Sequence, residues 1–419
     1  MPQIDGYNIL IVSKYFSTLT DFYNIQMVCK KFSDTMSKLH YNPVPISDKT
    51  ISHFPNLETL HVYNKGEVTL TDETPYTIII WYQVTYTEMA LSKRPNTTYK
   101  RVNYTLDDQK TYGKDLPPEV TVIGSHLYDE KNPVRSLNIT NRIVEIERSA
   151  FANNQKLLDV TLPVTLTKLG RTAFYSCCCL SGLTLPSTLR EMGESCFENC
   201  TSLEKINIPD KVTLLDKKCF GNCAVLFAVT LPSALSHLES AFYACSKLTS
   251  LNIPETITSF GERAFYKCLA LSTIDIPKCA EKFGKECFCK CRVSSIAFSQ
   301  NVNEIGVACC YECKFLNKIE IPDKITMIPE DCFAGCISLT HVKLPDTLLE
   351  ISTHAFGSCE TLNVITLPKS VTYVGQRAFE KCTSLIAVSC LGKVKVVDKD
   401  AFKDCNRLKI KPKDGCCIA

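Results

Sequence analysis

The segment Cys200–Cys223, CTSLEKINIPDKVTLLDKKCFGNC, decides the fold because its pattern recurs along most of the chain. It spaces apolar residues at Leu203, Ile206 and Ile208, follows them with a proline, and places Phe220 three residues before the closing cysteine. The aromatic position returns every 23 residues, apart from two steps of 22. A fixed period of this length predicts a solenoid, in which each coil buries its apolar side against the next.

An aromatic side chain fills this position in almost every repeat. A buried Phe contributes roughly 1.5–3 kcal/mol, so we expect the aromatic column to be the main contact between coils. Tyr128 opens the series, and Cys310 replaces the aromatic in one repeat. The full column is Tyr128, Phe151, Phe174, Phe197, Phe220, Phe242, Phe265, Phe288, Cys310, Phe333, Phe356, Phe379 and Phe402.

Each repeat also predicts one short strand followed by a turn. Ile206 and Ile208 alternate as in a strand, and Pro209 ends it because proline has no N–H for the ladder. A glycine often follows seven residues later, where we expect a turn that needs open backbone angles. The predicted fold class is a repeat solenoid, mainly β, with a 23-residue period and about 13 coils over residues 116–410.

The consensus IPxxVxxIGxxAFxxCxxL resembles the BspA-like class of leucine-rich repeats, which occurs in bacterial surface proteins and is expanded in parasitic protists. The resemblance extends from Leu116 to Leu408. It implies a curved β-solenoid that serves binding and carries no catalytic residues.

Cysteine is the other abundant feature, with 25 residues in the chain. Neighbours in the main column would meet the Cα spacing of a disulfide, but thiols also pack as small apolar groups. The N-terminus lacks the features of a secretory signal and no apolar run is long enough to span a bilayer. We therefore interpret the column as reduced core packing in a cytoplasmic protein. Its members are Cys177, Cys200, Cys223, Cys245, Cys268, Cys291, Cys313, Cys336, Cys359, Cys382 and Cys405.

Residues 1–42 are predicted to be a helical cap for the solenoid. Ile9, Val12 and Phe16 recur at helical spacing, and Thr20-Asp21 is a candidate cap for a second helix. The alternative is an F-box-like segment, because the run from Val12 to Phe32 resembles the second half of that motif. That resemblance implies a ubiquitin-ligase adaptor as partner, bound through Val28 and Phe32.

Residues 43–115 lose the period and are predicted to be an irregular β-rich transition. Leu57-x-x-Leu60-x-Val62 indicates one degenerate strand. Thr77–Thr87 is β-branched and aromatic, which favours another strand. The polar segment Lys93–Lys114 is predicted to be a loop.

Neither catalysis nor metal binding is predicted. Cysteines of two neighbouring repeats have spacings that would suit zinc, but all except Cys289 fall on repeat positions. There is no HExxH motif and no Gly-rich phosphate loop, so we predict no enzyme and no cofactor. The net charge of +3 gives no reason to expect nucleic acid as a partner. The considered zinc set is Cys287, Cys289, Cys291, Cys309, Cys310 and Cys313.

The exposed strand positions are the predicted binding surface for a protein partner. Their central stripe is small and polar, with charge gathered at Asp275, Glu320 and Lys343 and with His341 beside it. These four residues are the candidate partner-binding set. The stripe contains no Trp, Tyr or Arg, the residues that dominate binding hot spots. Its members are Asn138, Thr161, Thr184, Asn207, Thr230, Asn252, Asp275, Ala297, Glu320, Lys343, Thr366 and Ser389.

Residues 411–419 form a predicted flexible tail that ends in Cys416-Cys417-Ile418-Ala419. This ending fits the Cys-a-a-X prenylation motif, with Cys416 as the lipid acceptor. One prenyl chain holds a protein weakly, and nearby basic residues such as Lys409 and Lys411 would add attraction to acidic lipid. The leading hypothesis is a non-enzymatic interaction protein, tethered to the cytosolic face of a membrane. The alternatives are an F-box-like substrate receptor and a surface adhesin.

Overall fold

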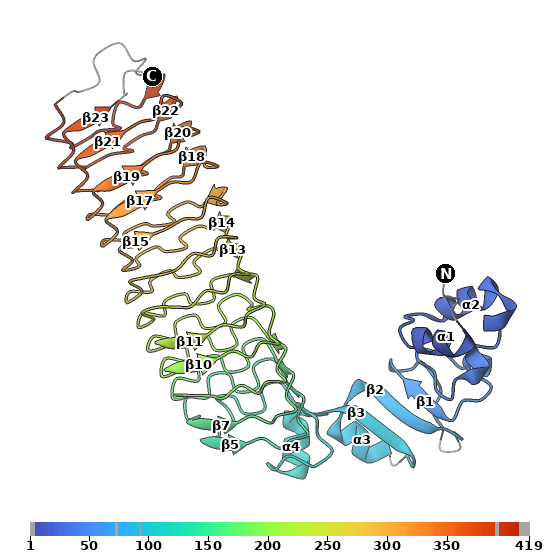
Figure 1. The fold of residues 1–419 in the computed structure, drawn as a ribbon. Helices are drawn as coiled ribbons and strands as arrows, with labels where there is room; N and C mark the ends of the chain where they lie inside the picture. The colour runs from blue at the N-terminus through green and yellow to red at the C-terminus, as the bar shows by residue number, and fades with distance from the viewer. Residues whose placement is uncertain (1–4, 72–73, 93, 390–393, 410–419) are drawn as a thin grey trace. The chain divides into compact units, whose positions relative to one another are not determined.

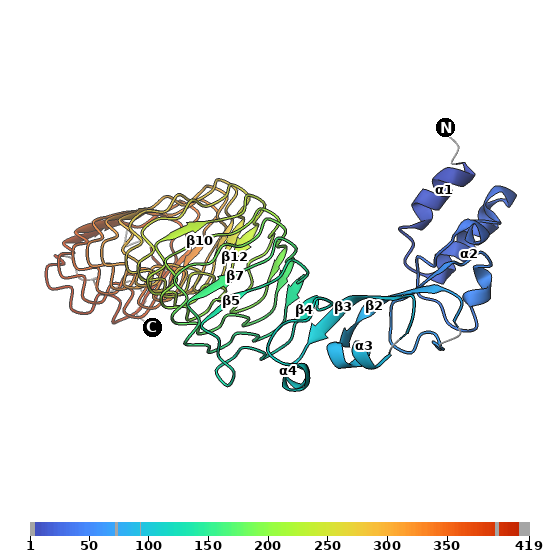
Figure 2. The ribbon, with the colours of Figure 1, turned by 90° about the horizontal axis from the view of Figure 1, so that it is seen from below.

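The computed structural model describes residues 5–71, 74–92, 94–389 and 394–409. The chain divides into two compact units, Met1–Gly124 and Ser125–Ala419. Figures 1 and 2 show short helices and a small sheet in the first unit, and a regular stack of coils in the second.

Unit 1 begins with two helices, α1 (Gly6–Ser13) and α2 (Leu19–Val28). The predicted cap of the second helix at Thr20-Asp21 is wrong, because Thr18 is the capping residue. The Thr18 hydroxyl accepts a hydrogen bond from the Asp21 N–H at 3.3 Å, and the Asp21 carboxylate accepts one from the Thr18 N–H at 2.8 Å. This reciprocal pair satisfies two backbone donors at the helix start. Three short 3-10 turns follow, at Lys30–Phe32, Met36–Lys38 and Ile51–His53.

The rest of unit 1 is a parallel sheet with short helices. The predicted strands at Leu57–Val62 and Thr77–Thr87 are confirmed. The loop predicted over Lys93–Lys114 is wrong, because the segment forms a strand and a helix. Val102 and Tyr104 are fully buried, and Thr105 caps the helix in a reciprocal pair with Asp108. The elements are β1 (Thr59–Val62), β2 (Thr77–Thr85), α3 (Tyr86–Ser92), β3 (Thr97–Tyr104), α4 (Leu106–Tyr112) and β4 (Val122–Ile123).

The helices and strands of unit 1 share one core. Phe22 of α2 and Met36 are buried in the same cluster as Leu60, Ile78 and Val102 of the first three strands. The N-terminal helical segment therefore covers the apolar side of the β1–β2–β3 sheet.

Unit 2 is the predicted β-solenoid, and its strands form two rows of parallel pairs (Figure 1). The first row contains β5 (Ser136–Asn138), β7 (Asp159–Thr161), β10 (Lys205–Asn207), β11 (Ala228–Thr230), β15 (Ser295–Ile296), β17 (Lys318–Glu320), β19 (His341–Lys343), β21 (Val364–Thr366) and β23 (Ala387–Ser389). The second row contains β6 (Glu145–Ile146), β8 (Lys168–Leu169), β9 (Glu191–Met192), β12 (His237–Leu238), β13 (Ser259–Phe260), β14 (Lys282–Phe283), β16 (Glu304–Ile305), β18 (Met327–Ile328), β20 (Glu350–Ile351), β22 (Tyr373–Val374) and β24 (Val396–Val397).

The aromatic column lies inside the solenoid, as predicted. Phe174, Phe197 and Phe220 are each 0% exposed. The Phe197 and Phe220 rings stack with centroids 5.6 Å apart and an interplanar angle of 0°. Tyr128 stacks on Phe151 at 5.3 Å and so takes the first place in the column. Because each ring rests on the ring of the next coil, the column holds neighbouring coils in register.

The cysteine column is also buried, and it makes a contact that the sequence analysis missed. Each thiol donates to the backbone carbonyl of the column residue one coil earlier, as Cys223 Sγ does to Phe197 O at 3.1 Å. The same bond joins Cys177 Sγ to Phe151 O at 3.1 Å. Burial raises the pKa of Cys177 to about 12, so the neutral thiol is strongly preferred. Cysteine therefore suits this position as a small apolar group with one donor.

The recurrent glycines have a different cause from the one predicted. Gly193 does not have a positive φ, but a Cβ there would lie 2.5 Å from the Arg171 backbone nitrogen of the preceding coil. The glycine is required by close approach between coils, not by an open turn. Apart from Gly335 (φ 75°), the left-handed positions on either side of the aromatic are instead non-glycine residues, such as Ser195 (φ 56°) and Asn199 (φ 63°).

Candidate binding face

The outer side of the first strand row is the candidate binding face. In each three-residue strand the middle residue points inward and the outer two point to solvent, as in β17, where Ile319 is buried between exposed Lys318 and Glu320. Alternation of this kind exposes one side chain on each side of a buried one. All members of the predicted polar stripe, from Asn138 to Ser389, are exposed.

The structure brings three of the four predicted partner-binding residues together. Glu320 on β17 is directly opposite Lys343 on β19, and Lys343 Nζ lies 3.3 Å from Glu320 Oε2. His341 begins the same strand as Lys343. Asp275 does not join them, because it lies two coils earlier with Ala297 between. Since Glu320 and Lys343 neutralise each other at short range, this group presents little net charge to a partner.

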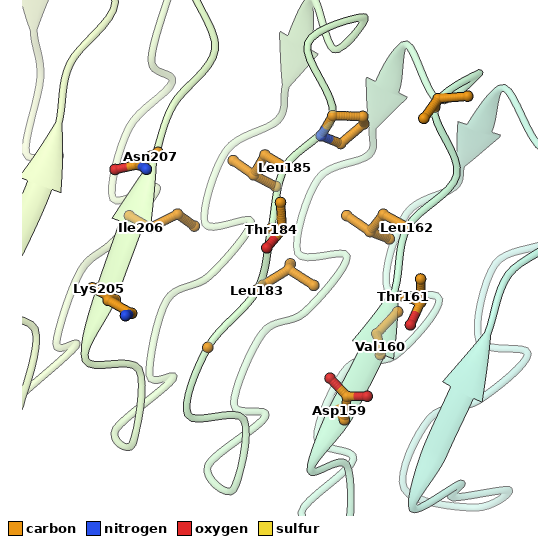
Figure 3. Close-up of a pocket in the computed structure, with 13 residues that line it drawn as sticks. Asp159, Val160, Thr161, Leu162, Leu183, Thr184, Leu185, Lys205, Ile206 and Asn207 are labelled. Carbon is orange, nitrogen blue, oxygen red and sulfur yellow. The ribbon is translucent and has the colours of Figure 1, made fainter.

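A hollow lies elsewhere on the same face, and it was not predicted from the sequence. It has a volume of about 700 Å³ and is bounded by β7, residues 182–186 and β10 (Figure 3). Asp159 and Lys205 lie at its two sides, and Thr161, Thr184 and Asn207 form a polar row across it. Only Gly182 signals the hollow in the sequence, because it occupies a strand position at which each other coil of the row has a side chain.

Gly182 differs from the close-packed glycines. A Cβ at this position would meet no atom within 4 Å, and its φ is not positive. Neither packing nor backbone geometry therefore requires glycine here. The consequence of the missing side chain is the open space above the strand.

The ladder of the first row is interrupted at this place, as it also is between β11 and residues 249–252 and between β19 and β21. Between β10 and β11 the Phe227 N–H donates to Glu204 O at 3.0 Å, and Ile208 N–H donates to Thr230 O at 3.0 Å. Within the described part of the chain, the equivalent bonds from Ser181 to Leu158 and from Leu162 to Thr184 do not form. The N–H groups of Ser181 and Leu162 and the carbonyls of Leu158 and Thr184 thus lack ladder partners beside the hollow.

Unit 1 exposes apolar side chains on its two helices. Val28 is 67% exposed and Met27 is 86% exposed, both at the end of α2. Tyr15 and Ile11 are also exposed. Phe32, the other predicted adaptor contact, is only 7% exposed and packs into the unit. Of the two predicted adaptor contacts, Val28 alone is accessible.

Unit 1 also carries an aromatic cluster on the outer side of its sheet. Trp81 on β2 stacks on Tyr63 with a centroid distance of 6.2 Å and an interplanar angle of 12°. Lys100 Nζ lies 5.6 Å from the centre of the Trp81 ring. No sequence pattern predicts this cluster, because its members come from separate segments outside the repeat.

The remaining predicted features concern metal, membrane and lipid. Among the described residues, no group of three or more His, Cys, Asp and Glu is placed to hold a metal ion. Cys291 and Cys313 each donate to a backbone carbonyl of the preceding coil, at 3.0 Å.

No helix in the described ranges is both long and apolar enough to cross a bilayer. Cys416 and the rest of the tail from residue 410 lie outside the described residues.

Comparison with known proteins agrees with this architecture. The family described as "BspA type Leucine rich repeat region" matches residues 121–240, 229–337 and 303–413. The chain belongs to this family. A leucine-rich repeat protein from Bacteroides ovatus is 30% identical, with a TM-score of 0.62, over 69% of this chain and 81% of that one. One from Eubacterium ventriosum is 21% identical, with a TM-score of 0.52, over 79% and 89%.

A search of curated proteins gives no significant match. The family and the two solved structures establish the leucine-rich-repeat solenoid. They leave the partner of this BspA-type protein to be inferred from its own residues.

Proposed function

We propose that this BspA-type protein is a non-enzymatic scaffold that binds a protein partner on the first strand row. One observation carries the proposal. The outer side chains of the row are exposed and mostly small and polar along the whole solenoid, above a core of stacked aromatic rings. A rigid, extended and accessible surface is what repeat proteins use for binding.

Site-specific cross-linking tests this proposal. A photoreactive amino acid at Thr230 or Thr366, both on the exposed row, should yield protein adducts in cells. The same group at Lys211 or Lys324, exposed turn residues outside the strands, serves as the control. The proposal fails if adducts form equally at all four positions, or at none.

We further propose that prenylation of Cys416 tethers the scaffold to the cytosolic face of a membrane. The support is the C-terminal Cys-a-a-X sequence, whose thiol accepts a prenyl group. Lys409, Lys411 and Lys413 precede it, and basic residues strengthen binding to acidic lipid by about 1 kcal/mol each.

Cell fractionation tests the tether. Cys416→Ser should move the protein from the membrane to the soluble fraction, and wild type should carry a prenyl mass on its C-terminal peptide. Cys405→Ser is the matched control, because Cys405 lies within the last described repeat. An unchanged membrane fraction for Cys416→Ser would contradict the tether.

A second candidate is an adaptor-binding role for the N-terminal helices, as in a ubiquitin-ligase substrate receptor. The observation in its favour is the uncovered apolar surface of Val28, Met27 and Tyr15. Exposed apolar groups gathered on a surface are typical of protein interfaces.

Surface and core variants separate adaptor binding from folding. Val28→Asp should abolish recovery of an adaptor while unit 1 remains folded, because the side chain is exposed. Phe32→Ala should instead destabilise unit 1, because the ring is buried. If Val28→Asp recovers as much adaptor as wild type, this candidate is excluded.

A further inference from the structure

We propose that the hollow between β7 and β10 binds an extended peptide segment with one basic and one acidic residue. The inference rests on the proposed function and names the class of partner. The segment would cross the strands above Gly182, with its basic side chain at Asp159 and its acidic side chain at Lys205 (Figure 3).

The two charges favour a dipolar ligand. Asp159 and Lys205 are exposed and occupy the same strand position two coils apart. Within the described residues neither forms an ion pair. By contrast, Glu320 and Lys343 on the same face are paired with each other. Two unpaired opposite charges on a binding face attract complementary charges and fix the orientation of the partner.

Gly182 provides the crossing point. Strands two coils apart are separated by about 10 Å, and level with Asp159 and Lys205 the segment between them has Gly182, which has no side chain to block the path. Alternate residues of an extended peptide point to the same side and are about 7 Å apart. A basic and an acidic residue separated by one residue can therefore reach the two charges while their main chain lies over Gly182.

The polar row and the interrupted ladder supply hydrogen bonds to the peptide main chain. Thr161 and Thr184 expose hydroxyl groups along the hollow. The Asn207 amide oxygen accepts from Thr230 Oγ1 at 2.8 Å, so its nitrogen remains a donor, and Figure 3 shows it on the side nearer Thr184. The N–H groups of Ser181 and Leu162 and the carbonyls of Leu158 and Thr184, which lack ladder partners, add further donors and acceptors. Main-chain bonding with charge selection is a known way to recognise extended peptides.

Synthetic peptides test this inference on the purified full chain. The probe is a fluorescein-labelled peptide Ser-Gly-Arg-Leu-Glu-Gly-Ser, compared with versions carrying Gln-Leu-Gln, Arg-Leu-Arg or Glu-Leu-Glu at the centre. We expect the Arg-Leu-Glu peptide to bind about tenfold more tightly than each of the others, which corresponds to about 1.4 kcal/mol. Equal affinities, or no binding of any peptide, would overturn the inference.

Protein variants localise the binding. Gly182→Phe adds a ring at a position where a Cβ meets no atom within 4 Å and should abolish peptide binding. Thr273→Phe places the same ring at the equivalent exposed repeat position of a distant coil and should leave binding intact. Asp159→Asn should remove the preference for Arg, and Lys205→Gln the preference for Glu. Wild-type binding by Gly182→Phe would contradict the proposed location.

Other occupants give distinct results. If neutral oligosaccharides bind and Gly182→Phe abolishes this, the ligand is a sugar and the peptide inference is wrong. If the purified chain dimerises and Gly182→Phe prevents it, the occupant is a second copy, which also overturns the inference. Failure here leaves the scaffold proposal standing as long as the strand row cross-links to a partner in cells.

Discussion

The inside of the solenoid and its first strand row follow the repeat to different degrees. Inside, the aromatic and thiol positions keep the same contacts over most coils, with the rings of Phe151, Phe174, Phe197 and Phe220 stacked within 6° of parallel; Cys310 replaces the ring in one coil. On the first strand row the ladder is broken into four separate sheets, and at the first break, between β7 and residues 181–184, Gly182 leaves a hollow. The comparison indicates that the interior maintains the fold while the outer row is free to vary for binding.

Alkaline pH should affect the interior most strongly. The pKa of Cys177 is raised to about 12 by burial, whereas an unfolded thiol has a pKa of about 8.5. The unfolded state therefore loses protons first, and stability declines from about pH 8.5 as the pH rises toward 12. A buried thiol whose pKa is raised as that of Cys177 is adds roughly 1.4 kcal/mol of destabilisation per pH unit.

Urea unfolding between pH 7 and 11 measures this effect. Cys177→Ala should show a shallower dependence on pH than wild type, whereas Cys179→Ala, which removes an exposed thiol, should not. A midpoint that stays constant up to pH 10.5 would show that the thiol column does not contribute as described.

Removal of one stacked ring should be the next largest effect. Phe220→Ala deletes a fully buried ring between Phe197 and Phe242, and such changes cost about 3–5 kcal/mol. Phe227→Ala is the matched control, because this ring is 49% exposed and its loss should change stability by about 0.5 kcal/mol or less. Similar urea midpoints for both variants would refute the difference between interior and face.

Substitution of two glycines should give an intermediate difference in stability. Gly193→Ala forces a Cβ within 2.5 Å of the preceding coil and should cost about 1–3 kcal/mol. Gly182→Ala meets no atom within 4 Å and should be neutral, or stabilising by about 0.4–1 kcal/mol through the unfolded state. Thermal melting distinguishes them, and a destabilised Gly182→Ala would mean that this glycine is structural after all.

The charged pair on the first strand row should give the smallest effect. Lys343→Ala removes the 3.3 Å contact with Glu320, but both side chains are more than 70% exposed. Exposed pairs contribute about 0–1 kcal/mol. A loss of stability well above that range, measured by urea unfolding, would indicate that this pair belongs to the framework.

The core positions that recur with the 23-residue period could be predicted from the sequence. The contacts between coils and the features of single coils could not. Phe220 and Cys223 could be placed in the core because each recurs with the same neighbours. The hydrogen bond from Cys223 to Phe197 could not be predicted, because it joins residues of different coils. The hollow at Gly182 could not be predicted either, because it depends on main-chain hydrogen bonds to a neighbouring coil that do not form.

Unit 1 has no sequence repeat, and its tertiary contacts could not be predicted from local sequence either. Tyr104 and Val102 lie in a segment whose polar composition favoured a loop, yet they pack into a core supplied by other segments. Trp81 and Tyr63 stack although Trp81 lies on β2 and Tyr63 follows the end of β1. Both results depend on tertiary contacts, which local propensity does not report.

Amide hydrogen exchange tests the central claim most directly, because it compares the closed and open parts of the first strand row in one experiment. The N–H groups of Phe227 and Ile208 are bonded to the neighbouring coil and should be strongly protected. The N–H groups of Leu162 and Ser181, which lack the equivalent bonds in the described structure, should exchange much faster. Equal protection of all four amides would show that the row is continuous and would contradict the account of an open site at Gly182.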